Sequence, residues 1–305
     1  MPVTGDSHLD PWPELSYPDF AGTQYLLHMG LQAVGKLKLK APFQPQWSAI
    51  VIAMSARGLT TGPIDHAGGV YEINLDLIAH ELICVTSWGR SERFALAPMS
   101  VAAFVRRLFE LLHKVGIEVS INPMPQEIAN PIPFDQDQEA RPYEPVLANR
   151  WWRIMLSTQR VMQAFRGAFE GKNQPVGLMW GTLDIRDVFY NGKTVAPPPG
   201  SDYIRRNAMN AELIEMGWWA GSAAYPRPAF YAFTYPQPAG IEDVAIRPAS
   251  ARWDATMGEF ILDYDQLRRS NDPDGDLLAF FRSTFRAGSA RAGWDPQLIG
   301  SGRAQ

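Results

Sequence analysis

The chain has 305 residues, of which 46% are hydrophobic and 20% are charged, and its net charge is −4. This composition is typical of a globular protein with a large core, and it excludes a disordered chain. The slight negative charge gives no reason to expect nucleic acid as a partner, because nucleic-acid binding depends on clustered Lys and Arg side chains.

The termini and the cysteine content indicate a cytoplasmic protein. The first residues contain neither the basic nor the apolar region of a signal peptide. No run approaches the ~18 apolar residues that a membrane span needs, so we expect no membrane partner. Cys84 is the single cysteine and lies in an apolar run, where a thiol behaves as a small hydrophobe. The sequence does not indicate an oligomeric state.

Apolar spacing predicts two helices and several strands in the first part of the chain. A helix is expected over 19–36, where Leu27, Leu31 and Val34 recur at helical spacing. A second helix is expected over 100–114, with Ser100 as its N-cap. Strands are expected over 48–55, 69–77, 80–87, 92–97 and 117–121, the first being apolar enough to be covered on both faces.

A proline-rich stretch separates these elements from a second set. Residues 123–143 predict an extended connector rather than a packed element. Helices are then expected over 144–170 and 202–216, and a last helix begins at Asp272-Pro273, an N-cap acid followed by an N1 proline. Further strands are expected over 175–182, 183–190, 228–235 and 258–262.

The order of elements predicts an α+β fold with a largely antiparallel sheet and helices packed on it. We interpret residues 1–305 as a single domain. In each of the halves 12–122 and 144–295, the predicted order is a helix, several strands and another helix. This order suggests the hypothesis of a duplication that forms one continuous sheet.

One candidate site lies in the glycine-rich turn after the first predicted strand. Arg57, Thr60 and Thr61 offer a guanidinium and two hydroxyls, and a tight turn adds N–H groups that bind a carboxylate or phosphate. The alternative is an arginine that ties the turn to a neighbouring acid such as Glu72.

A second candidate is a polar stripe on the first predicted helix. His28, Gln32 and Lys36 are four residues apart, so their side chains share one face of the helix. They could present an acid–base group and two ligand donors to a cavity. The alternative is a partly solvated face on which His28 bonds to the backbone.

A third candidate follows from alternation in a predicted strand. Trp180, Thr182, Asp184 and Arg186 would share one strand face, with Tyr231 on the facing strand closing the wall. The alternative is an Asp184–Arg186 contact on a half-exposed strand, which would contribute little to stability.

The sequence contains no motif that defines a cofactor or metal reaction. There is no His-Glu-x-x-His pair, phosphate loop, dinucleotide fingerprint or nucleophile elbow. We therefore expect neither a metal nor a cofactor.

Several sequence blocks between about 12 and 295 occur together in one known family. They are Trp12-Pro-Glu-Leu, the stretch from His28 to Lys36, Arg57-Gly-Leu-Thr-Thr, Pro131-Ile-Pro-Phe-Asp135, Trp180-Gly181 with Asp184, and Pro228-Ala-Phe-Tyr231. The chain thereby resembles a bacterial domain-of-unknown-function family, DUF5996. The resemblance implies a single-domain cytoplasmic bacterial protein and no particular activity. Relatives tend to have histidine where this chain has Gly177 and Ala211.

These features together predict a cofactor-independent protein that binds a small molecule in an aromatic-lined pocket. If it is an enzyme, only acid–base chemistry is supported, as in an isomerase, cyclase or hydrolase. His28 or Asp184 would carry the proton, and Arg57 or Lys36 would stabilise negative charge on a partly apolar substrate with an acidic group. The alternative is a non-catalytic ligand-binding or scaffold protein.

Overall fold

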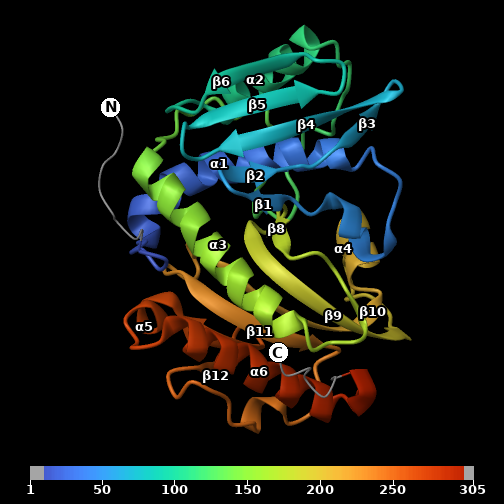
Figure 1. Cartoon of the computed structure of the whole chain (residues 1–305), viewed down its shortest axis with the longest axis vertical. Coiled ribbons are helices and arrows are strands. Elements are labelled where there is room, and N and C mark those ends of the chain that lie inside the picture. The colour runs from blue at the N-terminus through green and yellow to red at the C-terminus, as the bar shows by residue number, and fades with distance from the viewer. Residues whose placement is uncertain (1–9, 299–305) are drawn as a thin grey trace.

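The computed structural model describes residues 10–298 and shows two antiparallel sheets with helices packed on them (Figure 1). This confirms the predicted α+β class. The helices are α1 (Tyr17–Lys38), α2 (Val101–Lys114), α3 (Pro145–Arg166), α4 (Tyr203–Ala208), α5 (Tyr264–Arg268) and α6 (Pro273–Arg291). Short 3-10 helices span Pro45–Ile50, Ile241–Asp243 and Pro296–Leu298.

The first sheet is built from the N-terminal part of the chain. Its strands are β1 (Ala53–Ser55), β2 (Gly58–Thr60), β3 (Ile64–His66), β4 (Gly69–Asp76), β5 (Glu81–Thr86) and β6 (Ser91–Ala95). Their order is β1-β2-β4-β5-β6, and β3 pairs with β4. Helix α2 contacts β6 and α1, and α1 runs between the two sheets (Figure 1).

The second sheet is built from the C-terminal part of the chain. Its strands are β7 (Lys172–Asn173), β8 (Gly177–Met179), β9 (Asp184–Thr194), β10 (Ala211–Trp219), β11 (Ala229–Tyr235), β12 (Arg252–Asp254) and β13 (Glu259–Asp263). Their order is β12-β13-β11-β10-β9-β7, and β8 pairs with β9. Helices α3 and α6 contact each other and cover one face of this sheet.

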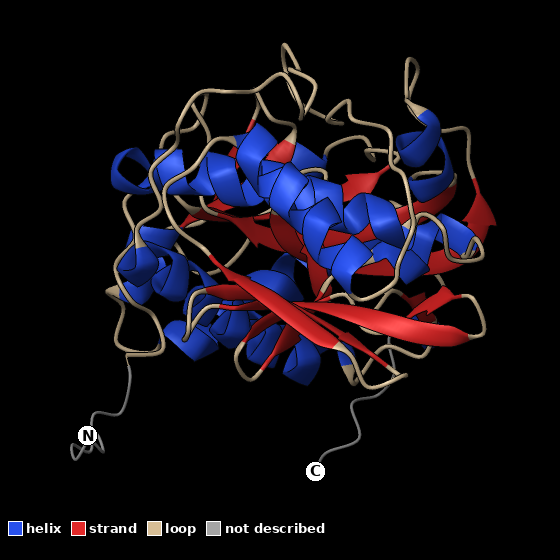
Figure 2. Cartoon of the chain, turned by 90° about the horizontal axis from the view of Figure 1, so that it is seen from above, coloured by secondary structure: helices blue, strands red, loops and turns tan. Residues whose placement is uncertain are grey.

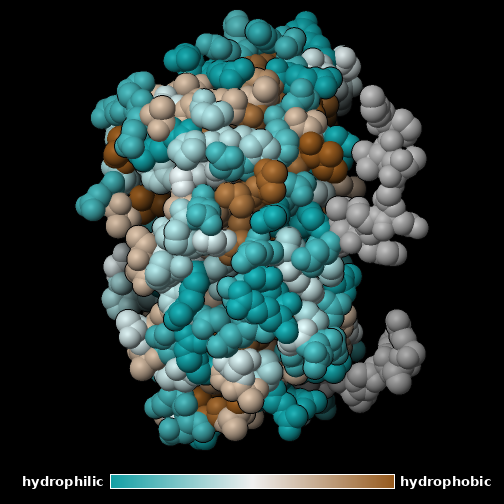
Figure 3. Space-filling view, turned by 90° about the vertical axis from the view of Figure 1, so that its left-hand side faces the viewer, coloured by the Kyte–Doolittle hydropathy of each residue, from teal (hydrophilic) through white to brown (hydrophobic). Residues whose placement is uncertain are grey.

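The core is a continuous hydrophobic cluster that includes residues of both sheets. Phe165, Phe189 and Phe285 form an aromatic group between the second sheet and its two helices, with ring centroids 5.2–5.5 Å apart. Viewed from above, strands and helices form adjacent layers (Figure 2). The face in Figure 3 is mainly hydrophilic, with apolar residues in small separate patches.

Local signals predicted the long helices well. Helix α2 begins where expected, and the Ser100 hydroxyl accepts a hydrogen bond from the Ala103 N–H at 3.1 Å. Helix α6 begins with Asp272, whose carboxylate accepts from the Gly275 N–H at 3.0 Å. Cys84 is buried in β5, as its apolar neighbours predicted.

Two expectations about the first part of the chain were wrong. Only the second half of the strand predicted over 48–55 forms, because residues 48–50 belong to a 3-10 helix in which positive φ angles at Gln46 and Trp47 turn the chain. Only β1 and a bridge from Ile52 to Leu178 remain, and this bridge joins the two sheets. Residues 117–121 form no strand and follow the turn at Gly116 as irregular chain.

Two expectations about the second part were also wrong. The helix predicted over 202–216 ends at Ala208, and the rest belongs to β10, a central strand of the sheet. Glu, Leu and Met favour helix locally, but pairing with β9 and β11 overrides that preference. The strand predicted over 175–182 stops at Met179, because residues 180–183 form a turn with Leu183 at φ 58°.

The connector and the duplication hypothesis also need correction. Residues 123–143 contain no helix or strand, as expected, but they are packed: Phe134, Asp137 and Tyr143 are buried. The strands form two sheets of different order rather than one continuous sheet, so the structure does not confirm a duplication. Among the described residues, no helix is long and apolar enough to cross a membrane.

Candidate functional site

A cavity of about 940 Å³ lies on one face of the second sheet. Along β9, Asp184, Arg186 and Tyr190 line it, while the alternate residues Ile185 and Phe189 point into the core under the helices. The cavity is therefore on the face that α3 and α6 leave free. Helix α4 and its flanking residues contribute further walls.

The register of the sheet creates the centre of the cavity. Gly217 of β10 pairs with Arg186 on one side and with Tyr231 on the other. A Cβ atom at Gly217 would lie 2.4 Å from Cε1 and 2.5 Å from the hydroxyl of Tyr231. Only glycine leaves room for the Tyr231 side chain to lie over β10.

The Tyr231 hydroxyl joins two carboxyl groups from neighbouring strands. It donates a hydrogen bond to Asp184 Oδ2, and it lies 2.9 Å from Glu215 Oε1. The Thr182 hydroxyl donates to the other oxygen of Asp184, and Arg186 donates to Glu215 Oε2 at 3.1 Å. These five side chains form one connected polar network in a mostly buried position.

The two contacts of the Tyr231 hydroxyl with carboxyl groups require one more proton than the hydroxyl itself supplies. A hydroxyl carries a single proton, so Tyr231 can donate to only one of its two carboxyl partners. The second contact is a hydrogen bond only when that carboxyl is itself protonated. Burial raises the pKa of Glu215, although Arg186 lowers it, which makes Glu215 the proton-bearing partner.

Other groups of the cavity also have perturbed acidity. Burial, followed by repulsion from Glu215 and Asp184, raises the pKa of Glu259 to about 8. Burial likewise raises the pKa of Glu127. Burial opposes the charge of Arg186, but Glu215 and Asp184 outweigh it and raise the arginine pKa. Arg186 therefore stays protonated while the surrounding carboxyl groups titrate.

The structure places the predicted helix stripe beside the cavity rather than in it. His28 Nε2 lies 2.9 Å from the Gly181 carbonyl, and burial lowers the pKa of the imidazole. The Gln32 amide exchanges two 2.8 Å hydrogen bonds with the backbone of Gln126. The two side chains therefore anchor the turn and the connector that carry the cavity residues Thr182 and Glu127.

Lys36, the third residue of the stripe, is buried, and so is the neighbouring Trp180. Burial lowers the pKa of Lys36 to about 8, and its ammonium group lies 6.0 Å from the centroid of the Phe134 ring. Trp180 packs directly on Gly35, where a Cβ would come within 2.2 Å of the indole. Neither residue lines the cavity, so Trp180 belongs to the core rather than to a ligand wall.

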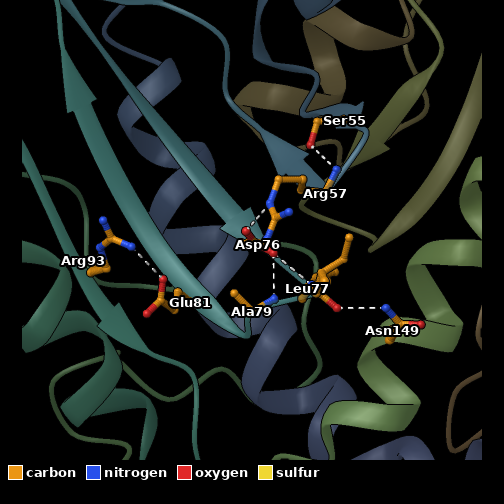
Figure 4. Close-up of polar contacts among 9 residues, drawn as sticks. Ser55, Arg57, Asp76, Leu77, Ala79, Glu81, Arg93 and Asn149 are labelled. Carbon is orange, nitrogen blue, oxygen red and sulfur yellow. Dashed lines mark hydrogen bonds and ion pairs between the residues drawn. The ribbon is translucent and has the colours of Figure 1, made fainter. Parts of the chain in front are cut away.

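The residues predicted around the glycine-rich turn lie on the first sheet and pair with one another. Arg57 bonds to Asp76 at 2.5 Å, and the Asp76 carboxylate also accepts from the Ala79 and Ile78 N–H groups (Figure 4). Thr60 donates to Glu72 at 2.8 Å. The Thr61 hydroxyl bonds to the Gly62 carbonyl and accepts from the Ile73 N–H at 3.0 Å. None of these four predicted residues lines the cavity.

The sequence patterns did not identify several residues of the cavity, among them Glu127, Arg205, Glu215 and Glu259. A signal for Glu215 did exist, because Ile214, Met216 and Trp218 alternate with it as an apolar strand face. Glu127 stands in a loop, Arg205 in the short helix α4 and Glu259 at the start of β13, and no local pattern marks them.

The structure gives no assignment for a metal or cofactor. Among residues 10–298, no three His, Cys, Asp or Glu side chains are arranged to hold a metal ion. The two positions at which the family resemblance led us to expect histidine lie outside the polar network. Gly177 sits against the Ile52 carbonyl, and Ala211 is buried at the start of β10.

Comparison with known proteins identifies the family alone. A family of unknown function, DUF5996, matches residues 12–301, so the chain belongs to that family. No curated protein and no solved structure matches the chain.

Proposed function

We propose that this member of the DUF5996 family binds a small, partly apolar molecule in the cavity of the second sheet. The cavity carries this proposal, because its volume of about 940 Å³ falls within the range of small-molecule sites and aromatic side chains line it. Trp219, Tyr231, Phe233 and Tyr235 supply that apolar wall, and the network around Tyr231 supplies fixed polar groups.

The charges of the cavity favour a ligand with a basic group. Five carboxyl groups and two guanidinium groups line it, and one of the guanidiniums is already paired with Glu215. Glu127 and Glu259 have no hydrogen-bond or ion-pair partner within residues 10–298. An ammonium group would pair with these carboxylates and stack on the aromatic wall. Arg57, which motivated the expectation of an acidic ligand, lies on the other sheet.

The same network supports acid–base chemistry without a cofactor. A protonated Glu215, the Tyr231 hydroxyl and the Asp184 carboxylate form a chain along which a proton can move by one step. Such a chain can accept a proton from a ligand at Asp184 and return one from Glu215. Isomerisation, cyclisation and hydrolysis are the reaction classes compatible with it.

The second candidate function is non-catalytic binding. The contacts of His28 and Gln32 with backbone groups favour it, because these side chains hold the cavity wall instead of lining the cavity. In either case we propose a small molecule as the partner and the cytoplasm as the location, consistent with the single buried thiol of Cys84.

The ligand class can be tested with two probes that have similar apolar bodies and opposite charges. We expect phenethylamine to raise the melting temperature of the full chain, and phenylpropionate, which carries the opposite charge on a similar body, to leave it unchanged. Amine binding should strengthen as the pH rises through about 8, because Glu259 then loses its proton. Preferential binding of the carboxylate would contradict the proposed ligand class.

Two tyrosine variants locate the binding site. Tyr231→Phe removes the hydroxyl from the network, whereas Tyr25→Phe removes a comparable hydroxyl bonded to Asp137 at 2.8 Å outside the cavity. We expect only Tyr231→Phe to weaken amine binding, by about tenfold for one lost charge-assisted hydrogen bond. Native mass spectrometry of both variants would also show whether a copurified ligand is lost. Equal behaviour of the two variants would place binding elsewhere.

A further inference from the structure

A second hollow of about 600 Å³ runs along α6 and shares no lining residue with the cavity of the Tyr231 network. Its walls are one face of α6 and the segment 244–247 that follows the second 3-10 helix. Four arginines line it: Arg247, Arg282, Arg286 and Arg291. We call this hollow the arginine groove.

The charges of the arginine groove are not compensated within the chain. Across residues 10–298, none of the four guanidiniums forms an ion pair, whereas most other arginines near a carboxylate do. Arg282 and Arg286 are one helical turn apart, a spacing at which like charges repel. This concentration of positive charge occurs in a protein whose net charge is −4.

Two of the arginines are held in place by specific contacts. The Ser283 hydroxyl accepts from the Arg247 N–H at 2.9 Å and lies 3.2 Å from the Arg247 carbonyl, which fastens this residue to α6. Arg291 rests on Gly240, where an added Cβ would lie 3.2 Å from Nη1. The backbone of Arg247 is thus fixed to α6, and the groove has arginines on both of its walls.

The floor between them is made of small residues. Gly275, Ala279, Ala287 and Ala290 line the groove, so no bulky side chain of α6 fills it. A groove of this volume accommodates a small molecule. Guanidinium groups present planar forks of N–H donors that match phosphate oxygens, and several converging forks suit a group with two or more negative charges.

We propose that the arginine groove is a binding site for a small phosphate-bearing molecule. The ligand would place its phosphate oxygens between Arg247 and the arginines of α6, with any apolar part lying on the alanine floor. A longer polyanion such as nucleic acid is disfavoured, because the overall charge of −4 would repel the rest of its backbone.

Inorganic pyrophosphate is the probe, titrated calorimetrically into the full chain at low ionic strength. Arg247→Gln/Arg286→Gln should weaken its binding at least tenfold. Arg106→Gln/Arg269→Gln, which removes two exposed helical arginines outside the groove, should bind like the unchanged protein. Arg205→Gln controls for the larger cavity, whose unpaired guanidinium could also attract the probe.

The position of the probe can be read independently. Bound pyrophosphate should protect Arg247, Arg282, Arg286 and Arg291 from modification by phenylglyoxal, measured by peptide mass spectrometry, while Arg106 stays reactive. Absence of pyrophosphate binding, equal losses in the two double variants, or loss confined to Arg205→Gln would overturn the proposal. Tighter binding of a 20-nucleotide single strand than of pyrophosphate would overturn the choice of a small ligand. Circular dichroism of each variant verifies that the fold is retained.

Discussion

The two sheets carry similar sets of polar side chains but use them differently. On the first sheet, Arg57 and Thr60 pair with acids of β4, and the Arg57 side chain is 59% exposed. On the second sheet, Arg186 meets Glu215 across neighbouring strands, and its side chain is only 14% exposed. The polar residues of the first sheet satisfy one another in separate pairs, whereas those on the face of the second sheet that α3 and α6 leave free line one shared cavity.

The test with the largest expected effect on stability compares an arginine on each sheet. Arg186→Met removes the positive charge beside the buried carboxyl groups of Asp184 and Glu215, so we expect the free energy of unfolding to fall by about 3–5 kcal/mol. Arg57→Met removes an exposed partner of Asp76 and should cost less than about 1 kcal/mol. Urea unfolding of both variants measures the two values. Equal losses would show that burial does not separate the two ion pairs.

A smaller effect is expected from the glycine that admits Tyr231. Gly217→Ala places a Cβ 2.4 Å from the Tyr231 ring, which must shift and abandon Asp184. We expect a destabilisation of about 1–3 kcal/mol together with weaker amine binding. The matched control is Gly167→Ala at the end of α3, where the nearest atom lies 4.0 Å away. A stable Gly217→Ala variant that still binds the amine would separate Tyr231 from the site.

The pH dependence of stability provides a further test of the second sheet. Glu259 has a folded pKa of about 8, above its ordinary 4.5, so the folded state retains a proton that the unfolded chain releases. Its contribution to stability is complete below about pH 4.5 and is lost as the pH rises through 8. Glu259→Gln should flatten this decline in thermal unfolding between pH 5 and 8.5. An unchanged slope would mean that Glu259 does not titrate in this range.

The smallest effect is expected at the turn of the first sheet. Thr60→Val removes hydrogen bonds to Glu72 and from the Gly62 N–H, at 2.8 and 3.0 Å. Because the site is partly exposed, the loss should be about 1 kcal/mol, measured as a shift of the urea midpoint. Amine binding should be unaffected, since Thr60 does not line the cavity. Thr256→Val, at an exposed position, controls for the change of side chain.

Sequence patterns predicted the elements whose signals are local. The periodicity of α1, the serine cap of α2 and the Asp272-Pro273 start of α6 are set by neighbours within one helical turn. They failed at β10, where helix-favouring residues are held in a strand by pairing on both sides. They also failed at residues 48–50, which belong to a 3-10 helix instead of the start of a buried strand.

The candidate site was predicted in part for the same reason. Alternation along one strand placed Asp184 and Arg186 together, and the structure puts Tyr231 beside them. The sequence patterns could not show that Arg57 and Thr60 lie away from these residues, because the glycine-rich turn was an equally plausible candidate site. Nor could they find Glu215 as the second partner of Tyr231, because that contact depends on the pairing of β10 with β11.

The sequence by itself determined the fold class, the capped starts of α2 and α6 and which residue types were available for chemistry. Tertiary structure decided which of them meet. Asp184, Glu215 and Tyr231 lie on three different strands and face one cavity only because β10 stands between β9 and β11 with Gly217 in register. Strand order and register are set by packing between distant segments, and a local pattern of side chains does not encode them.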